Sequence, residues 1–372
     1  MTNTILEANK LGQSIWYDNI SRSLIKSGEL KDLIALGVSG ITSNPTIFEK
    51  AISNSSDYDA DILEATSLRL TPTQTFYHLA KNDIRDASDL LLPVYYKSNG
   101  LDGYISLEVN PVLSNSTAQT ITEAIELFKI LQRPNIMIKV PATDAGIPAI
   151  RELIKEGVNI NVTLIFSLSM YRKVMNSYIA GLEDRLLLGK DIDKISSVAS
   201  FFVSRIDTKV DPLIYEATNS NDKPPTGLLG FTAIANASLA YHEFQNTFKN
   251  SRFNKLKENG ANVQKPLWAS TGTKNKNYSD VHYIESLIGL NTVNTMPPQT
   301  IKAFLNHGKV SQSLGDKVIE ATKILDKVSS LGINLDSITD QLLIEGVDAF
   351  TYSFKTLIEN ISRKMNSLSN HI

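Results

Sequence analysis

The stretch NIMIKVPATDAGIPAIRELIKEGVNINVTLIFS, residues 135–167, decides the fold. It contains two short apolar or β-branched runs, 135–140 and 159–165, on either side of a segment with helical periodicity that ends at Gly157. Glycine often ends a helix because it adopts the left-handed backbone conformation without a steric penalty. This order of segments predicts a strand, a helix and a second strand parallel to the first.

The same alternation runs along the rest of the chain. Further strands are predicted at 14–18, 38–44, 103–109, 197–204, 267–271 and 292–296. Eight strands that alternate with helices predict an α/β protein, a single (β/α)8 (TIM) barrel domain over 1–372, with a doubly wound open sheet as the alternative. Two longer gaps, 45–102 and 205–266, are interpreted as helical insertions.

The segment 298–372 has helical pattern throughout and is interpreted as a helical C-terminal extension. Three roles are open for these helices: packing on the barrel, covering it as a lid, or forming a subunit interface.

Polar side chains share one side of several predicted strands. Because residues of a strand alternate sides, Lys139 lies opposite Ile138 and Val140, which outer helices would cover. The polar side must then face the interior near the carboxyl ends of the strands, where barrels of this kind build their active sites. The residues concerned are Asp18, Asn44, Glu108, Lys139, Asn161 and Thr163.

A structural interpretation of these residues is also open. Asn44 precedes Pro45 and is a plain helix-cap candidate, and Glu108 could simply pair with Lys139 in a buried salt bridge. A structural barrel interior would favour Val, Ile and Leu, however, so the convergence of six polar residues favours a reaction site.

The set supports one kind of chemistry in particular. Lys139 lies in an apolar strand, where burial is expected to lower the pKa of its amine and leave it free to attack a carbonyl. The product would be a Schiff base, which withdraws electrons while a carbon–carbon bond breaks or forms. Asp18 and Glu108 are suited to move the protons that such a reaction needs.

Several motifs resemble the transaldolase family, in its longer branch of roughly 370 residues. They are WYDNISR at 16–22, GITSNPTIFEKAI at 40–52, SLEVNP at 106–111, IMIKVPAT at 136–143 and NVTLIFS at 161–167. The resemblance implies a (β/α)8 barrel of the pentose phosphate pathway. It would transfer a dihydroxyacetone unit from sedoheptulose 7-phosphate to glyceraldehyde 3-phosphate, giving erythrose 4-phosphate and fructose 6-phosphate.

The resemblance also implies roles for individual residues. Lys139 matches the Schiff-base lysine, and Asp18 matches the residue that takes and returns the proton of the substrate C4 hydroxyl. Glu108 and Thr163 match the pair that holds the catalytic water. The remaining matches bind the substrate or line its pocket: Asn44 and Asn161 at the dihydroxyacetone hydroxyls, and Ser200 and Phe202 at the sixth strand.

The predicted phosphate site departs from the family pattern. Arg205 and Ser270 match family residues that contact phosphate, but many members have an arginine two residues after the serine, where this chain has Gly272. We predict that Lys274 supplies the second cation, and that the glycine lets backbone N–H groups approach the phosphate. A solvated loop lysine is the alternative.

The composition argues against several other classes. The chain of 372 residues has no cysteine, which excludes disulfides, zinc–thiolate sites, iron–sulfur clusters and cysteine nucleophiles. With 37 Lys and Arg against 39 Asp and Glu, nucleic acid is not an expected partner. No signal peptide and no long apolar run is visible, so a soluble cytoplasmic protein without membrane contact is expected.

No cofactor or metal is expected either. The five histidines, at 78, 242, 282, 307 and 371, are scattered, and neither a Walker A loop nor a G-x-G-x-x-G motif occurs. The expected partners are small sugar phosphates, with a homodimer suggested by the family resemblance. Two alternatives to transaldolase are open: a Schiff-base fructose 6-phosphate aldolase, and a barrel that binds sugar phosphates without turnover.

Overall fold

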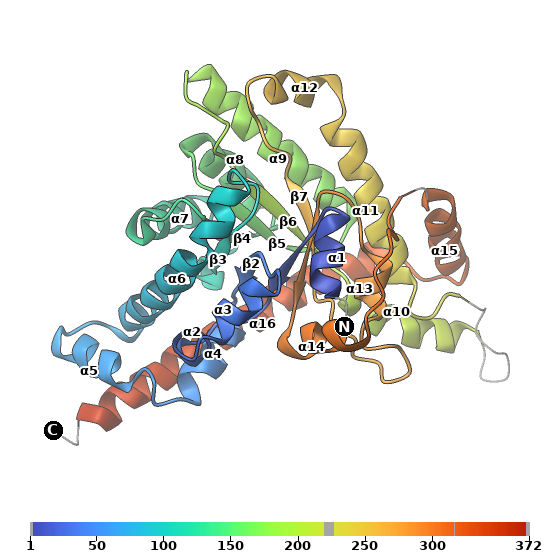
Figure 1. Ribbon diagram of the computed structural model, residues 1–372. Helices are drawn as coiled ribbons and strands as arrows, with labels where there is room; N and C mark the ends of the chain where they lie inside the picture. The colour runs from blue at the N-terminus through green and yellow to red at the C-terminus, as the bar shows by residue number, and fades with distance from the viewer. Residues whose placement is uncertain (1–2, 219–226, 316, 370–372) are drawn as a thin grey trace.

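The computed structural model describes residues 3–218, 227–315 and 317–369. Its centre is a closed barrel of eight parallel strands in chain order, in which the first strand pairs with the last (Figure 1). The strands are Gln13–Tyr17 (β1), Gly40–Thr42 (β2), Ile105–Glu108 (β3), Ile136–Pro141 (β4), Ile160–Ile165 (β5), Ser197–Phe202 (β6), Lys265–Ala269 (β7) and Thr292–Met296 (β8). The predicted (β/α)8 barrel is confirmed, and the closure between β1 and β8 excludes the doubly wound sheet.

All eight strands lie within or next to the predicted ranges. The prediction for β7 begins and ends two residues too late, and β2 is shorter than predicted because a helix begins at Pro45, soon after it. Asn44 caps that helix, its Oδ1 accepting a hydrogen bond from the Ile47 N–H at 3.0 Å. The predicted strand 38–44 is therefore wrong at both ends.

Helices surround the barrel and fill the predicted insertions. Residues 45–102 hold Pro45–Ser53 (α4), Asp59–Ser67 (α5) and Pro72–Lys97 (α6). The described residues of 205–266 belong in part to Ser204–Ala217 (α10), Thr232–Phe248 (α11) and Ser251–Lys257 (α12). Positions 219–226 of the second insertion are outside the described residues. The other helices before β8 are Thr4–Lys10 (α1), Arg22–Lys26 (α2), Glu29–Ala35 (α3), Pro111–Leu113 (η1), Thr117–Leu131 (α7), Gly146–Glu156 (α8), Leu168–Leu187 (α9) and His282–Ser286 (α13).

The strand register brings the polar residues side by side. Glu108 on β3 lies opposite Lys139 on β4, and Lys139 lies opposite Asn161 on β5. Neighbouring residues of parallel strands point to the same face of the sheet, so all three side chains share the barrel interior. The outward positions Ile136, Ile138 and Val140 are fully buried.

The C-terminal extension comprises Pro298–His307 (α14), Val318–Ser330 (α15) and the 35-residue helix Leu335–Ser369 (α16), while residues 316 and 370–372 are outside the described part. In Figure 1, α16 is the long red helix that runs across the barrel and ends beside α5. Phe354 packs edge-to-face on Phe76 of α6 with ring centroids 5.6 Å apart. Ser353 of α16 hydrogen-bonds Thr46 of α4 at 2.8 Å between hydroxyl oxygens.

One close approach shows where α16 crosses. A Cβ on Gly346 would lie 2.9 Å from the Leu164 side chain of β5, so α16 passes closer to this strand end than a larger residue would allow. Among the helices of the described residues, none is long and apolar enough to cross a bilayer.

Candidate active site

Lys139 is buried at the carboxyl end of β4, with 4% of its surface exposed. Its Nζ donates a hydrogen bond to the Ser43 carbonyl oxygen at 2.9 Å and lies 3.4 Å from Glu108 Oε2. The Phe350 ring of α16 is centred 5.8 Å from the same Nζ. A buried amine beside one carboxylate, with an aromatic ring above it, is shielded from bulk water.

Both carboxylates of the site are held in an environment that disfavours their charge. Burial raises the pKa of Glu108, and the nearby Lys139 offsets part of this effect. Burial also raises the pKa of Asp18, although the Thr42 hydroxyl donates a hydrogen bond to Asp18 Oδ1 at 2.6 Å. A raised pKa makes a carboxyl group a better proton acceptor, which is a property of acid–base catalysts.

A hydrogen-bonded chain of polar residues crosses the interior next to Lys139. Ser200 donates to Asn161 Oδ1 at 2.7 Å, and Asn161 Nδ2 donates to Ser106 Oγ at 3.0 Å. By contrast, Thr163 Oγ1 and Glu108 Oε2 are buried without a hydrogen-bond partner among the described residues. Buried polar atoms are rarely left unpaired, so these two oxygens indicate where a substrate or a water molecule binds.

Two cations face the same space from different segments. Arg205 at the start of α10 lies over the Phe202 ring, 5.2 Å from guanidinium carbon to centroid. Neither Arg205 nor Lys274 has an ion-pair or hydrogen-bond partner in the side-chain contacts of the described ranges. Partial burial and the positive charge of Arg205 lower the pKa of Lys274. Two unpaired, mutually repelling cations over one cavity make it electropositive, a property that attracts anions.

A cavity of about 210 Å³ joins these residues. Of the predicted site residues, it is lined by Asp18, Asn44, Lys139, Thr163, Ser200, Phe202, Arg205, Ser270 and Lys274. The other two lie directly behind the lining, Glu108 against Lys139 and Asn161 against Ser200. Asn44 combines both interpretations offered by the sequence, because it caps α4 and also lines the cavity.

Sequence reasoning missed some residues of this cavity. Thr42 and Thr295, whose hydroxyls are 2.6 Å apart, line it from β2 and β8. Their polar side chains at strand ends carry the same signal that found Thr163. Phe350 also lines the cavity, and no sequence pattern distinguishes it from the other apolar positions of α16.

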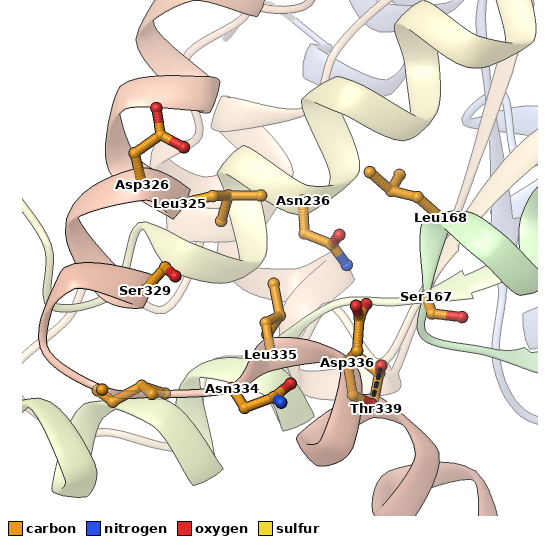
Figure 2. A pocket seen from close by; sticks show the side chains of 12 residues that line it. Ser167, Leu168, Asn236, Leu325, Asp326, Ser329, Asn334, Leu335, Asp336 and Thr339 are labelled. Atoms are coloured by element: carbon orange, nitrogen blue, oxygen red, sulfur yellow. Dashed lines mark hydrogen bonds between the residues drawn. The ribbon is translucent and has the colours of Figure 1, made fainter.

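A larger cavity of about 540 Å³ lies between α9, α11, α15 and α16 (Figure 2). Asp326 and Asp336 are the charged residues among the described side chains that line it, with Ser167 and Asn236 as polar neighbours. Its described lining contains neither a lysine for covalent chemistry nor another cation for phosphate. The smaller cavity is therefore the candidate active site.

A metal ion has no evident place in the described part of the chain. Within residues 3–218, 227–315 and 317–369, no group of three or more His, Asp or Glu side chains is arranged to hold one.

A (β/α)8 barrel with a buried lysine, two carboxylates and two cations at the strand ends has the arrangement of an imine-forming barrel enzyme. Comparison with known proteins identifies the family within this class. A profile of the transaldolase/fructose-6-phosphate aldolase family matches residues 15–361. The chain belongs to this family.

Curated relatives match nearly the whole chain. The transaldolase of Trichodesmium erythraeum is 45% identical and transaldolase 2 of Nostoc sp. is 46% identical, each over 99% of both chains. The transaldolase of Saccharopolyspora erythraea is 43% identical over 98% of this chain and 99% of its own. The predicted family is confirmed, and the relatives support transaldolase function, an activity of the transferase class.

The raised pKa of Asp18 predicts how stability depends on pH. Because the folded state binds this proton more tightly than the unfolded state, stability falls as pH rises from the unfolded pKa, about 3.9, through the folded pKa. Asn cannot ionise and keeps an acceptor for the Thr42 hydroxyl. We expect Asp18→Asn to be more stable than the wild type at pH 8, with the difference shrinking toward pH 4.

Urea unfolding midpoints across this pH range measure the effect. Asp340→Asn, which changes an exposed carboxylate on α16, is the matched control and should shift the midpoint little at any pH. An Asp18→Asn protein that is less stable than the wild type at pH 8 would contradict the electrostatic account.

Proposed function

We propose that this protein is a transaldolase of the pentose phosphate pathway that works through a Schiff base on Lys139. It transfers a dihydroxyacetone unit from sedoheptulose 7-phosphate to glyceraldehyde 3-phosphate and releases erythrose 4-phosphate and fructose 6-phosphate. The observation that carries the proposal is the pairing of buried Lys139 and Glu108, 3.4 Å apart, beside a cavity that Arg205 and Lys274 also face.

The first step is attack by the Lys139 amine on the substrate C2 carbonyl. The amine must lose a proton, and Glu108 can accept it because burial raises the pKa of its carboxyl. The carbinolamine then loses water to give the imine. Glu108 Oε2, which is paired with Lys139 but accepts no hydrogen bond, and Thr163 Oγ1, which has no hydrogen-bond partner among the described residues, support a role in holding that water and passing its proton.

The second step breaks the C3–C4 bond. Asp18 takes the proton of the C4 hydroxyl, the C4 carbonyl of the leaving aldose forms, and the bonding electrons move into the imine on Lys139. Asp18 is partly buried, its pKa is raised by burial, and it shares the cavity with Lys139, which supports this role. The three-carbon unit stays bound as an enamine until an acceptor aldehyde enters and the steps run in reverse.

Two sets of residues are proposed to recognise different parts of the substrate. Asn44, Asn161 and Ser200 are proposed to bind the hydroxyls of the three-carbon unit, because amide and hydroxyl groups can both donate and accept hydrogen bonds. Arg205, Ser270 and Lys274 are proposed to bind the phosphate. The homodimer and the cytoplasmic location stay predictions from the sequence.

Turnover of fructose 6-phosphate with and without erythrose 4-phosphate tests the proposal. A transaldolase produces glyceraldehyde 3-phosphate and sedoheptulose 7-phosphate together, and only when erythrose 4-phosphate is present. Rapid release of glyceraldehyde 3-phosphate without an acceptor would instead identify an aldolase. No turnover under either condition would leave a binding protein.

The same assay applied to Lys139→Ala should give only background, because Lys274, the other amine of the described cavity lining, is much more exposed than Lys139. Lys129→Ala, which changes an exposed lysine on α7, is the control and should retain wild-type activity.

Replacing Lys274 tests the proposed phosphate site. We expect Lys274→Ala to raise KM for fructose 6-phosphate roughly tenfold, the effect of losing one charge-assisted contact, with a smaller change in kcat. Lys276→Ala, in the same loop but outside the cavity lining, is the matched control. Unchanged kinetics in Lys274→Ala would remove this lysine from the site.

A further inference from the structure

Two buried carboxylates lie behind the proposed phosphate site without facing the cavity. Asp207 and Asp211 occupy successive turns of α10, with 1% and 6% of their surfaces exposed. Neither pairs with a cation in the described part of the chain, although an unpaired buried carboxylate is costly. Both carboxylates accept hydrogen bonds from other segments of the chain instead.

Asp207 joins three segments. Its Oδ1 accepts a hydrogen bond from the Ala233 N–H of α11 at 2.7 Å, and its Oδ2 accepts one from the Tyr283 hydroxyl of α13 at 2.9 Å. Burial and the neighbouring Asp211 raise the pKa of Asp207 to about 7.

Asp211 repeats the pattern one turn later. Its Oδ1 accepts a hydrogen bond from the Gly230 N–H at 3.1 Å, and its Oδ2 accepts one from the Tyr278 hydroxyl at 2.8 Å. Gly230 has a φ of +78°, and a Cβ there would lie 2.9 Å from the Tyr278 ring. The His282 ring, 5.5 Å from the Tyr278 ring between centroids, hydrogen-bonds the Gly230 carbonyl at 2.7 Å. Each aspartate thus connects α10 to the segment that contains both tyrosines.

The connected segments are the ones that supply the two cations. Arg205 lies two residues before Asp207 on α10, and Lys274 lies four residues before Tyr278. The Thr273 hydroxyl donates to the Ser279 carbonyl at 2.9 Å and closes the loop around Lys274. Ser204, at the start of α10, hydrogen-bonds Ser270 at 3.0 Å between hydroxyl oxygens.

A structural restraint that keeps Lys274 close to Arg205 would have a physical reason. Arg205 and Lys274 repel each other, so without a restraint the loop would move away from α10 whenever no anion is bound. A preorganised pair binds phosphate more tightly because the cost of bringing the charges together is met when the protein folds.

We propose that Asp207 and Asp211 are positioning residues for phosphate recognition, which hold the Lys274 loop against α10 through the hydroxyls of Tyr283 and Tyr278. The inference rests on the proposed function, because it assigns the phosphate of the sugar to this pair of cations. Neither aspartate touches the substrate.

The mildest test removes a hydroxyl and leaves the ring. Tyr278→Phe, on a partly exposed side chain, and the double variant Tyr278→Phe/Tyr283→Phe delete the donors to Asp211 and Asp207. Tyr178→Phe is the matched control, because its buried hydroxyl donates to the Asn262 carbonyl at 2.7 Å away from this site. Far-UV circular dichroism and thermal melting establish that each variant is folded.

The kinetic readout compares phosphorylated and unphosphorylated acceptors. With fructose 6-phosphate as donor, kcat/KM for erythrose 4-phosphate should fall about tenfold in the double variant, since displacement of a binding group by an ångström costs up to ~10²-fold. The value for erythrose, which has no phosphate, should change less than about twofold. A similar fall for both acceptors, or no fall for either, would overturn the proposal.

Calorimetric titration with inorganic phosphate tests the positioning claim without turnover. We expect the Kd of phosphate to rise about tenfold in the double variant, to rise less in Tyr278→Phe and to stay unchanged in Tyr178→Phe. Equal affinity in all four proteins would contradict the proposal even if transaldolase activity is found. If the wild type binds phosphate but transfers no three-carbon unit, the proposed function fails while the positioning claim is still decided.

Discussion

The burial of one amine, that of Lys139, is the constraint on which the rest of the structure depends. An ammonium group taken out of water is costly unless a counter-charge and hydrogen-bond acceptors come with it. The barrel supplies these through its register, which puts Glu108 beside Lys139, and through the Ser43 carbonyl that accepts a hydrogen bond at 2.9 Å. Because Glu108 lies on β3 and Ser43 directly follows β2, the amine is held by the strand ends of the barrel.

The polar groups of the candidate active site reduce the stability of the folded protein. Glu108 and Asp18 are carboxyl groups whose burial raises their pKa values, and Thr163 Oγ1 has no partner among the described residues. An apolar barrel interior would avoid all three penalties. The C-terminal helix α16 completes this environment, because its Phe350 ring lies over Lys139 and its Gly346 lets the helix approach β5 closely. These contacts support packing of α16 on the barrel, with Phe350 covering Lys139.

The sequence predicts the barrel and most of the candidate site for a simple physical reason. Strand periodicity and the side on which polar residues fall are local properties, so Asp18, Glu108, Lys139 and Thr163 can be assigned to strand ends without knowledge of the fold. The position of Phe350 over Lys139 depends on the path of a helix that follows β8 by almost forty residues, and no local pattern reports it. The hydrogen bond between Asp207 and Tyr283 cannot be predicted from local sequence patterns either, because the two residues are 76 positions apart. Thr42 and Thr295 are also polar residues at strand ends, so the same pattern predicts that they lie at the site.

Borohydride reduction in the presence of fructose 6-phosphate, followed by intact mass and peptide mapping, tests the central claim that Lys139 forms the Schiff base. Reduction converts the imine into a stable amine that survives digestion. The account predicts one reduced dihydroxyacetone unit, located on the peptide that contains Lys139, and none on Lys139→Ala. An active, folded protein that gains no adduct, or gains it on another lysine, would contradict the account.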